Sequence, residues 1–261
     1  MLTKLLKKDL KVNMRWMWIL FIATIAVAGI TRGFKEIGEN IAFFKILGIF
    51  FDSIFYTLAV NIILQPFLRN FLNFAKSFYS DESYLTHTLP VTKNQLLNSK
   101  FLTAIIEIAL GFACLILSLL IMFASPTLFD TLKLLLSTII TGDFPLLLVL
   151  ALMVILIFVE FYMFISIIYF SIVTAYKEKE KRVLKTFLIT VAMSFAALTV
   201  LSIVMVIVLL INGVDLASST LILSNTGFFS IIITGIIVYT MVIITFYFLT
   251  KKEFNKGVNV D

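Results

Sequence analysis

The sequence has few residues of the kinds that build disulfide frameworks and metal centres. Its single cysteine, Cys114, excludes an intrachain disulfide, and the apolar residues around it predict a buried core position. Its single histidine, His87, has no second histidine or cysteine with which to form a zinc site. Phosphate-loop, H-E-x-x-H and C-x-x-C motifs are absent. We therefore expect no catalytic residues, no metal and no cofactor on this chain, which would not itself be an enzyme.

Charged residues are also scarce. Only 14% of the 261 residues are charged, whereas about 25% is usual for a soluble domain. Hydrophobic residues make up 61% of the chain, and the mean hydropathy is +1.09. These values indicate an integral membrane protein. The net charge of +6 comes without an arginine cluster or a basic and aromatic platform, so it favours contact with anionic lipid headgroups and not with nucleic acid.

Six apolar segments are long enough to cross a bilayer as helices, which requires roughly 20 residues each. They are residues 15–31, 46–68, 101–124, 146–175, 187–211 and 228–249. Lipid offers no partner to unpaired backbone groups, so helices are expected throughout. The predicted fold is an all-α membrane protein with one six-helix transmembrane domain, residues 15–250. Two pairs of small residues spaced by four, Gly29 with Gly33 and Ala192 with Ala196, could mark close helix contacts.

The basic residues predict how the chain is oriented. Seventeen of the 21 lysines and arginines fall on the side that carries both termini, so both termini are expected in the cytoplasm. Residues 1–14 have leucines on one helical face and lysines on the other, which predicts an amphipathic helix on the inner membrane surface. Residues 251–261 would form a cytoplasmic tail. No small-residue cleavage site follows the first apolar run, so no cleavable signal peptide is expected.

Three acidic residues lie inside the predicted spans: Asp52, Glu107 and Glu160. A charged group in the centre of a bilayer costs roughly 2.5–3.5 kcal/mol on insertion scales. These acids are either hydrogen-bonded within the bundle or line a translocation path. Asn61 and Gln65, one turn apart, are further candidates for that path or for bonds between helices. We expect no lysine or arginine within the spans to pair with the acids.

Residues 69–100 form the longest polar interruption of the chain. Within them, Ser80 followed by Asp81 and Glu82 is typical of a helix start, with a capping hydroxyl and acids near the positive end of the helix dipole. Pro90 disfavours helical geometry in the residue before it. A short cytoplasmic helix of about two turns is therefore predicted between the second and third spans.

A second helix is predicted directly after the proline. Thr92 and Gln95 have the spacing of a capping box, and the helix they begin would run into the third span. The short helix would thus be held between two membrane helices. Such a connector is longer than a simple link requires, which favours a docking element. The side chains it would display are Tyr84, Leu85, His87 and Thr88.

This interruption resembles a stretch found in small bacterial permeases of the ABC-2 type. The resemblance rests on Ser80-Asp81-Glu82-Ser83-Tyr84-Leu85-Thr86-His87-Thr88-Leu89-Pro90-Val91-Thr92, followed by Gln95-Leu96-Leu97 and Ser99-Lys100. In layout it extends to the whole chain, with six spans, cytoplasmic ends, an amphipathic N-terminal helix and short outer loops. Permeases of this size are similar to exporters of phenol-soluble-modulin and lantibiotic-type peptides.

The resemblance implies the function and the partners of the chain. Two permease subunits, identical or related, would pair with a dimer of ATPase subunits, which hold ATP and Mg²⁺, in the bacterial cytoplasmic membrane. The short helix would be the coupling helix that docks into a groove on the ATPase. Its coupling residues would be Asp81, Glu82, Tyr84, Leu85, His87, Thr88 and Leu89. The apolar spans suit an amphipathic peptide or another lipophilic cargo.

Two other interpretations of the sequence stay open. The first is a secondary transporter that uses Glu160 and Asp52 as proton sites, although no interrupted helices or inverted repeats are evident. The second is a membrane subunit that binds a peptide without transporting it, as an immunity or sensor protein would.

Overall fold

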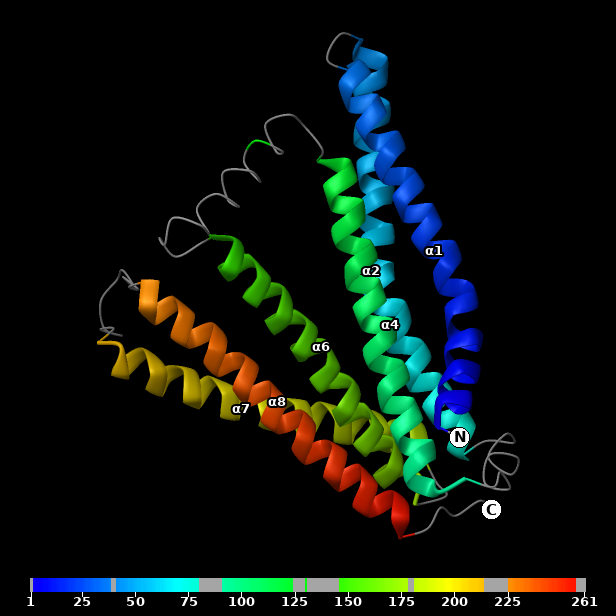
Figure 1. Ribbon diagram of the computed structural model, residues 1–261, viewed down its shortest axis with the longest axis vertical. Coiled ribbons are helices and arrows are strands. Elements are labelled where there is room, and N and C mark those ends of the chain that lie inside the picture. Colours follow the sequence, from blue (N-terminus) through cyan, green and yellow to red (C-terminus); the bar gives the residue numbers. More distant parts are fainter. Residues whose placement is uncertain are drawn as a thin grey trace. The chain divides into compact units, whose positions relative to one another are not determined.

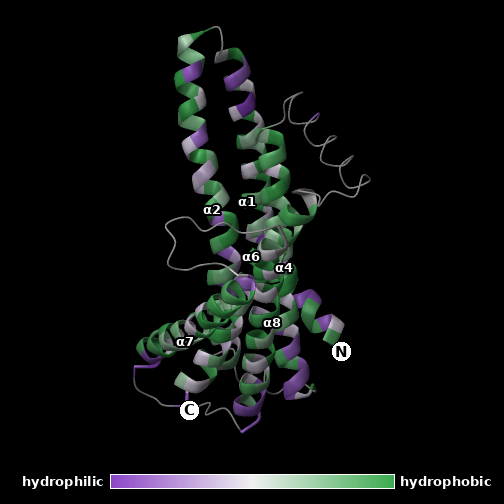
Figure 2. Cartoon of the chain, turned by 90° about the vertical axis from the view of Figure 1, so that its left-hand side faces the viewer, coloured by the Kyte–Doolittle hydropathy of each residue, from purple (hydrophilic) through white to green (hydrophobic). Residues whose placement is uncertain are grey.

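The fold was obtained as a computed structural model, which describes residues 2–38, 41–79, 91–123, 130, 146–177, 181–213 and 225–256. Within these residues the chain is entirely helical (Figure 1). Six helices are long and apolar enough to cross a membrane, which confirms the predicted all-α fold with six spans. They are α1 (Leu2–Gly38), α2 (Ala42–Tyr79), α4 (Lys93–Met122), α6 (Leu146–Ala175), α7 (Arg182–Ile211) and α8 (Asn225–Asn255). Hydrophobic residues dominate the helices, and hydrophilic ones gather toward their ends (Figure 2).

Helix α1 is much longer than the first predicted span. Its 37 residues extend about 55 Å, compared with about 30 Å for the hydrocarbon core of a bilayer. No break separates residues 1–14 from the span, so the expected N-terminal helix forms the first turns of α1. The amphipathic pattern is present in these turns. Met14 is buried, whereas the basic side chains are exposed, namely Lys4, Lys7, Lys8, Lys11 and Arg15.

Helices α2 and α4 also extend past their predicted spans on either side of residues 80–92. Helix α2 continues from the predicted boundary at Leu68 to Tyr79. Helix α4 begins at Lys93, directly after Thr92, as the capping box predicts. Each helix therefore runs without interruption from the polar segment into the membrane span. Helix α8 likewise continues to Asn255, into the predicted cytoplasmic tail.

The chain divides into two compact units. Unit 1 comprises Met1–Leu72 and Gln95–Leu134, and unit 2 comprises Asn73–Asn94 and Leu135–Asp261. Unit 1 thus holds α1, most of α2 and nearly all of α4. Unit 2 holds the last turns of α2, the first residues of α4, and helices α6, α7 and α8.

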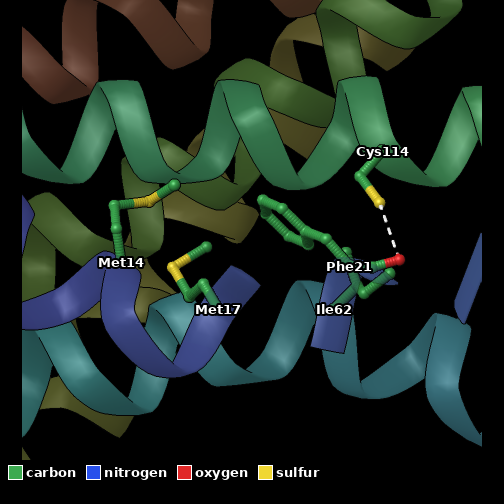
Figure 3. Packing of buried hydrophobic residues seen from close by; sticks show 5 residues of the cluster. All are labelled: Met14, Met17, Phe21, Ile62 and Cys114. Atoms are coloured by element: carbon green, nitrogen blue, oxygen red, sulfur yellow. Dashed lines mark hydrogen bonds between the residues drawn. The ribbon is translucent and has the colours of Figure 1, made fainter. Parts of the chain in front are cut away.

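The core of unit 1 joins all three of its helices. In one cluster Met14, Met17 and Phe21 of α1 pack with Ile62 of α2 and Cys114 of α4 (Figure 3). The thiol sulfur of Cys114 lies 4.0 Å from the carbonyl oxygen of Phe21. The single cysteine is therefore a buried core residue, as predicted. A second cluster joins the same helices through Ala28, Phe55 and Met122.

Helices α2 and α4 approach closely where Gly111 faces Ile62. A Cβ atom at Gly111 would lie 3.3 Å from the Ile62 carbonyl oxygen and 3.9 Å from the Pro66 ring. Pro66 has no N–H and cannot donate to that carbonyl, four residues earlier in the helix. The Ile62 carbonyl therefore lacks its usual backbone hydrogen bond at the point where Gly111 allows α4 to approach α2. By contrast, a Cβ at Gly29 would meet nothing within 4 Å, so this predicted contact position is open.

Gly111→Ala and Gly29→Ala make a matched pair of changes within unit 1. Alanine is favoured over glycine inside a helix by up to about 1 kcal/mol. We expect Gly29→Ala to keep or raise the thermal unfolding midpoint of the purified chain. Gly111→Ala should lower it, because its methyl group would press on backbone that cannot rotate away. An equal rise for both variants would show that the close approach at Gly111 does not matter for stability.

Unit 2 is built around three long helices, α6, α7 and α8, that contact one another. Its core contains Met163 and Ile167 of α6, Ala197 of α7 and Tyr239 of α8. Helix α7 contributes little to this core, and most of its apolar side chains are exposed. Ala192 and Ala196 are among its exposed residues. This predicted pair of small residues therefore marks no helix contact within the unit.

Candidate functional site

Glu107 is the most deeply enclosed of the three acidic residues in the spans. Its side chain on α4 is 0% exposed. The carboxyl Oε2 accepts a hydrogen bond of 2.8 Å from Nδ2 of Asn70 on α2. Asn13 of α1 is a further polar neighbour of the same carboxyl, although Oε1 has no partner of hydrogen-bond geometry among the described residues. Glu107 thus holds helices together inside unit 1, and its enclosure argues against direct contact with cargo.

A second polar contact ties α1 to α4 near Glu107. Lys100 Nζ lies 2.9 Å from Asp9 Oδ1, and both side chains are largely buried. The Ser99 hydroxyl donates to the other oxygen of Asp9 at 3.3 Å. Asp9 and Asn13 are one helical turn apart on the inward face of α1. Sequence analysis missed this cluster. The available signal was a pair of polar residues, four positions apart, on the leucine-rich face of the helix.

Arg69 of α2 completes the polar cluster of unit 1. Its Nη1 donates to the backbone oxygen of Asn13 at 3.3 Å, and its Nε donates to Oε1 of Gln65 at 3.0 Å. The guanidinium also lies 5.9 Å from the ring centroid of Trp16. Gln65 therefore acts on α1 only through Arg69. The cluster brings two predicted site residues, Gln65 and Glu107, into one region.

Asp52 lies farther along α2, and it has a basic partner that sequence analysis did not expect. Lys35 Nζ is 2.9 Å from Asp52 Oδ1, a distance typical of an ion pair, although the direction is not that of a hydrogen bond. The expectation that no lysine pairs with these acids was wrong, because α1 continues as helix through Lys35 to Gly38. The pair lines an open pocket of about 530 Å³ that also contains Lys45.

Asn61 makes no bond to another helix among the residues that the structure describes. Its Nδ2 donates to the backbone oxygen of Thr57 at 2.9 Å, within α2. Asn70 makes the same kind of bond to Pro66, at 2.8 Å, but it also reaches Glu107. The two asparagines therefore differ in one contact between helices.

Glu160 stands apart from the other acids, in unit 2. It lies at the middle of α6 and is partly buried. Its polar neighbour is the hydroxyl of Tyr239 on α8. Tyr239 itself is buried in the core of the unit. No ion pair to Glu160 occurs within the described ranges.

The predicted coupling residues lie outside the described part of the chain. They are Asp81, Glu82, Tyr84, Leu85, His87, Thr88 and Leu89. The end of α2 that precedes them is described, and it is fixed by aromatic packing in unit 2. Phe74 stacks on Tyr169 of α6 with ring centroids 4.1 Å apart, and Phe78 meets the ring of Phe254 on α8 at 4.8 Å. All four rings are fully buried.

Both flanks of the undescribed segment reach the same end of α8. On one flank, Phe78 packs on Phe254; on the other, Asn94 Oδ1 accepts a hydrogen bond of 3.4 Å from Nδ2 of Asn255. Tyr79 adds a contact to Tyr176, with ring centroids 4.6 Å apart. Burial, followed by the influence of Tyr176, raises the pKa of Tyr79, so this phenol stays neutral.

A salt bridge fixes the end of α8 to the residues that follow α6. Glu253 pairs with Lys177 and, at 2.8 Å, with Lys256. Hydrogen bonds from Lys177 and then Lys256 lower the pKa of Glu253 to about 2. The carboxylate therefore stays charged across the physiological pH range. In the described part of the chain, no three His, Cys, Asp or Glu side chains gather where they could hold a metal ion.

Comparison with protein-family models, with curated proteins and with solved structures finds no match to this chain.

Proposed function

We propose that this chain is the transmembrane permease subunit of an ATP-driven exporter of the ABC-2 type. ATP and Mg²⁺ would be held by a dimer of separate ATPase subunits, and a second permease, identical or related, would complete the membrane part. Residues 81–89 would dock on the ATPase. The likeness of residues 80–100 to the coupling segment of such permeases supports this proposal, together with the six membrane-spanning helices.

One structural observation carries the proposal furthest: the flanks of the proposed docking segment are anchored to a common element. The Phe78–Phe254 ring contact and the Asn94–Asn255 hydrogen bond attach both flanks to the end of α8. Helices α2 and α4 also continue without a break from these flanks into the spans. A displacement of residues 81–89 would therefore be passed to α2, α4 and α8 together, as coupling to an ATPase requires.

An amphipathic peptide, of toxin or lantibiotic type, is the cargo that suits this chain best. The described spans consist mainly of Ile, Leu, Phe and Val, and their Ser, Thr and Asn side chains mostly bond to the backbone of their own helix. Such a lining favours a cargo with a large apolar face over a sugar or a small ion. The distribution of basic residues supports a bacterial cytoplasmic membrane location with both termini inside.

The surroundings of Asp52 and Glu107 disfavour a proton-driven transporter that would use these two acids. Asp52 is paired with Lys35, and Glu107 is enclosed and bonded to Asn70. A subunit that binds a peptide without moving it would share this architecture, so the test must measure flux.

The experiment is export of a fluorescent amphipathic peptide by vesicles that contain the chain with its companion ATPase. We expect flux that requires hydrolysable ATP and that persists when a protonophore removes the proton gradient. Flux that continues without ATP and stops with the protonophore would favour the secondary transporter. Peptide binding without any flux would favour the immunity or sensor subunit.

A further inference from the structure

Glu160 is the only charged side chain in the three predicted spans of unit 2. Residues 146–175 contain no other Asp, Glu, Lys or Arg, and residues 187–211 and 228–249 contain none. It sits at the middle of the 30-residue helix α6, where a charged group is most costly to keep in a bilayer. A charge retained at that depth needs a partner of opposite charge or a hydrogen-bond donor.

The other two acids have basic groups nearby, whereas no ion pair to Glu160 is found among the residues that the structure describes. Asp52 has Lys35 at 2.9 Å, and Arg69 is among the charges that act on Glu107. Glu160 has the neutral hydroxyl of Tyr239 as its polar neighbour. One hydroxyl can supply one hydrogen bond, whereas a carboxylate has two oxygens that accept several. Part of the acceptor capacity of Glu160 is therefore unused.

Glu160 is also more accessible than Glu107. Its side chain is only partly buried, while Tyr239 lies behind it in the core of the unit. Leu156, Val159 and Phe164 of the same helix are apolar, and they pack against the cluster that contains Tyr239. A partly exposed carboxylate on an apolar helix can accept a cation from its open side.

A second copy of this chain cannot supply that cation. Among the six predicted spans the only lysine or arginine is Arg15, at the first residue of the first span. No basic side chain of an identical permease therefore lies at the depth of Glu160. The partner must come from another molecule.

We propose that Glu160, positioned by Tyr239, binds the cationic group of an amphipathic peptide cargo, a lysine ammonium or an arginine guanidinium. The apolar helix contacts the apolar face of the peptide, and the carboxylate selects for positive charge. This inference rests on the proposed export function and adds the charge class of the cargo. A charged hydrogen bond in a site of low dielectric is stronger than in water, so loss of the carboxylate should be easily measured.

The test is peptide binding to the purified chain in nanodiscs of phosphatidylcholine, which carry no net lipid charge. The probes are a fluorescent amphipathic leucine–lysine peptide and the same peptide with every lysine acetylated, which removes the charge. We expect Glu160→Gln to raise the Kd for the lysine peptide about tenfold and to leave the Kd for the acetylated peptide unchanged. Empty nanodiscs measure binding to lipid alone.

Three further variants make the result specific. Glu160→Asp and Tyr239→Phe keep the negative charge, so both should retain the preference for the lysine peptide. Glu253→Gln removes a carboxylate from the same unit outside the spans, and both peptides should bind it as they bind the unchanged chain. The proposal would be overturned if the Kd for the lysine peptide and the Kd for the acetylated peptide were the same, both for the unchanged chain and for Glu160→Gln. An equal loss of binding for both peptides would also overturn it, because that result indicates a structural role.

The binding assay also separates this inference from the proposed function, since it needs neither ATP nor an ATPase. Binding that depends on Glu160 without ATP-driven flux would leave the cation site standing and reject export. ATP-driven flux without any preference for the charged peptide would support export and reject the cation site at Glu160.

Discussion

Replacing Tyr84 and Leu85 together by alanine will reduce the ATPase activity of the assembled complex to that of the ATPase subunits alone. The two side chains are apolar residues of the proposed docking segment, and a helix that lies in a groove depends on such anchors. Truncating an anchor at the centre of a small interface costs about 2 kcal/mol or more, which is enough to release a short helix. Membrane insertion should be unaffected, because the six spans are unchanged.

The measurement is ATP hydrolysis by complexes reconstituted with the double variant, compared with hydrolysis by the ATPase alone. Val183 and Leu184 provide a matched control, since both are exposed apolar residues at the start of α7. Alanine at these two positions should leave stimulation largely intact. Full stimulation and normal export by the Tyr84 and Leu85 variant would show that this segment does not couple the subunits.

Asn70→Leu is expected to destabilise unit 1 more than the same change at Asn61 of the same helix. Asn70 donates to Glu107 at 2.8 Å, and Glu107 is fully enclosed. Removing the Asn70 amide leaves the buried carboxyl without this hydrogen bond. The free energy of unfolding should fall by about 1–3 kcal/mol, or by more if the carboxyl is charged. The thermal unfolding midpoint of the purified chain should fall accordingly.

Two companion variants test the cause of this loss. Asn61→Leu removes the same side chain from the same helix, but Asn61 bonds only to the backbone of Thr57, so a small change is expected. Adding Glu107→Leu to Asn70→Leu should recover much of the stability, because two apolar side chains replace a broken polar pair. Equal losses from Asn61→Leu and Asn70→Leu would mean that the contact with Glu107 contributes little.

The sequence predicted the helices best where apolar runs end at clear polar boundaries. Helix α6 occupies the predicted residues 146–175, because a long run in which Glu160 is the only charged residue lies between Pro145 and a group of charged residues. Helix α4 begins where the capping box at Thr92 places it. Local chemistry decides both boundaries, and local chemistry can be read from sequence.

The polar contacts could not be predicted in the same way, because they join residues far apart in the chain. Lys35 was assigned to an outer loop, since a lysine usually ends an apolar run. In the structure it lies within α1 and pairs with Asp52 of the next helix. Asp9 was assigned to a basic surface helix, although it faces Lys100, 91 residues later. Only the packing of α1 against α2 and α4 reveals these partners.

The aromatic anchor at the end of α2 was likewise hidden in the sequence. Phe74 and Phe78 stood in a segment assigned to the polar interruption, yet they are fully buried against Tyr169 and Phe254. Their spacing of four residues was the available signal, because it places both rings on one helical face. The docking residues 81–89 themselves stay a prediction.

Docking can be tested most directly by a cysteine placed at Thr88 in a chain whose only cysteine, Cys114, is replaced by alanine. In membranes that contain the companion ATPase with a cysteine in its proposed groove, we predict a crosslinked product of the two subunits that changes in yield when ATP is bound. The contradicting result is a Thr88→Cys side chain that reacts fully with a water-soluble maleimide and forms no crosslink, while ATP-driven export proceeds normally.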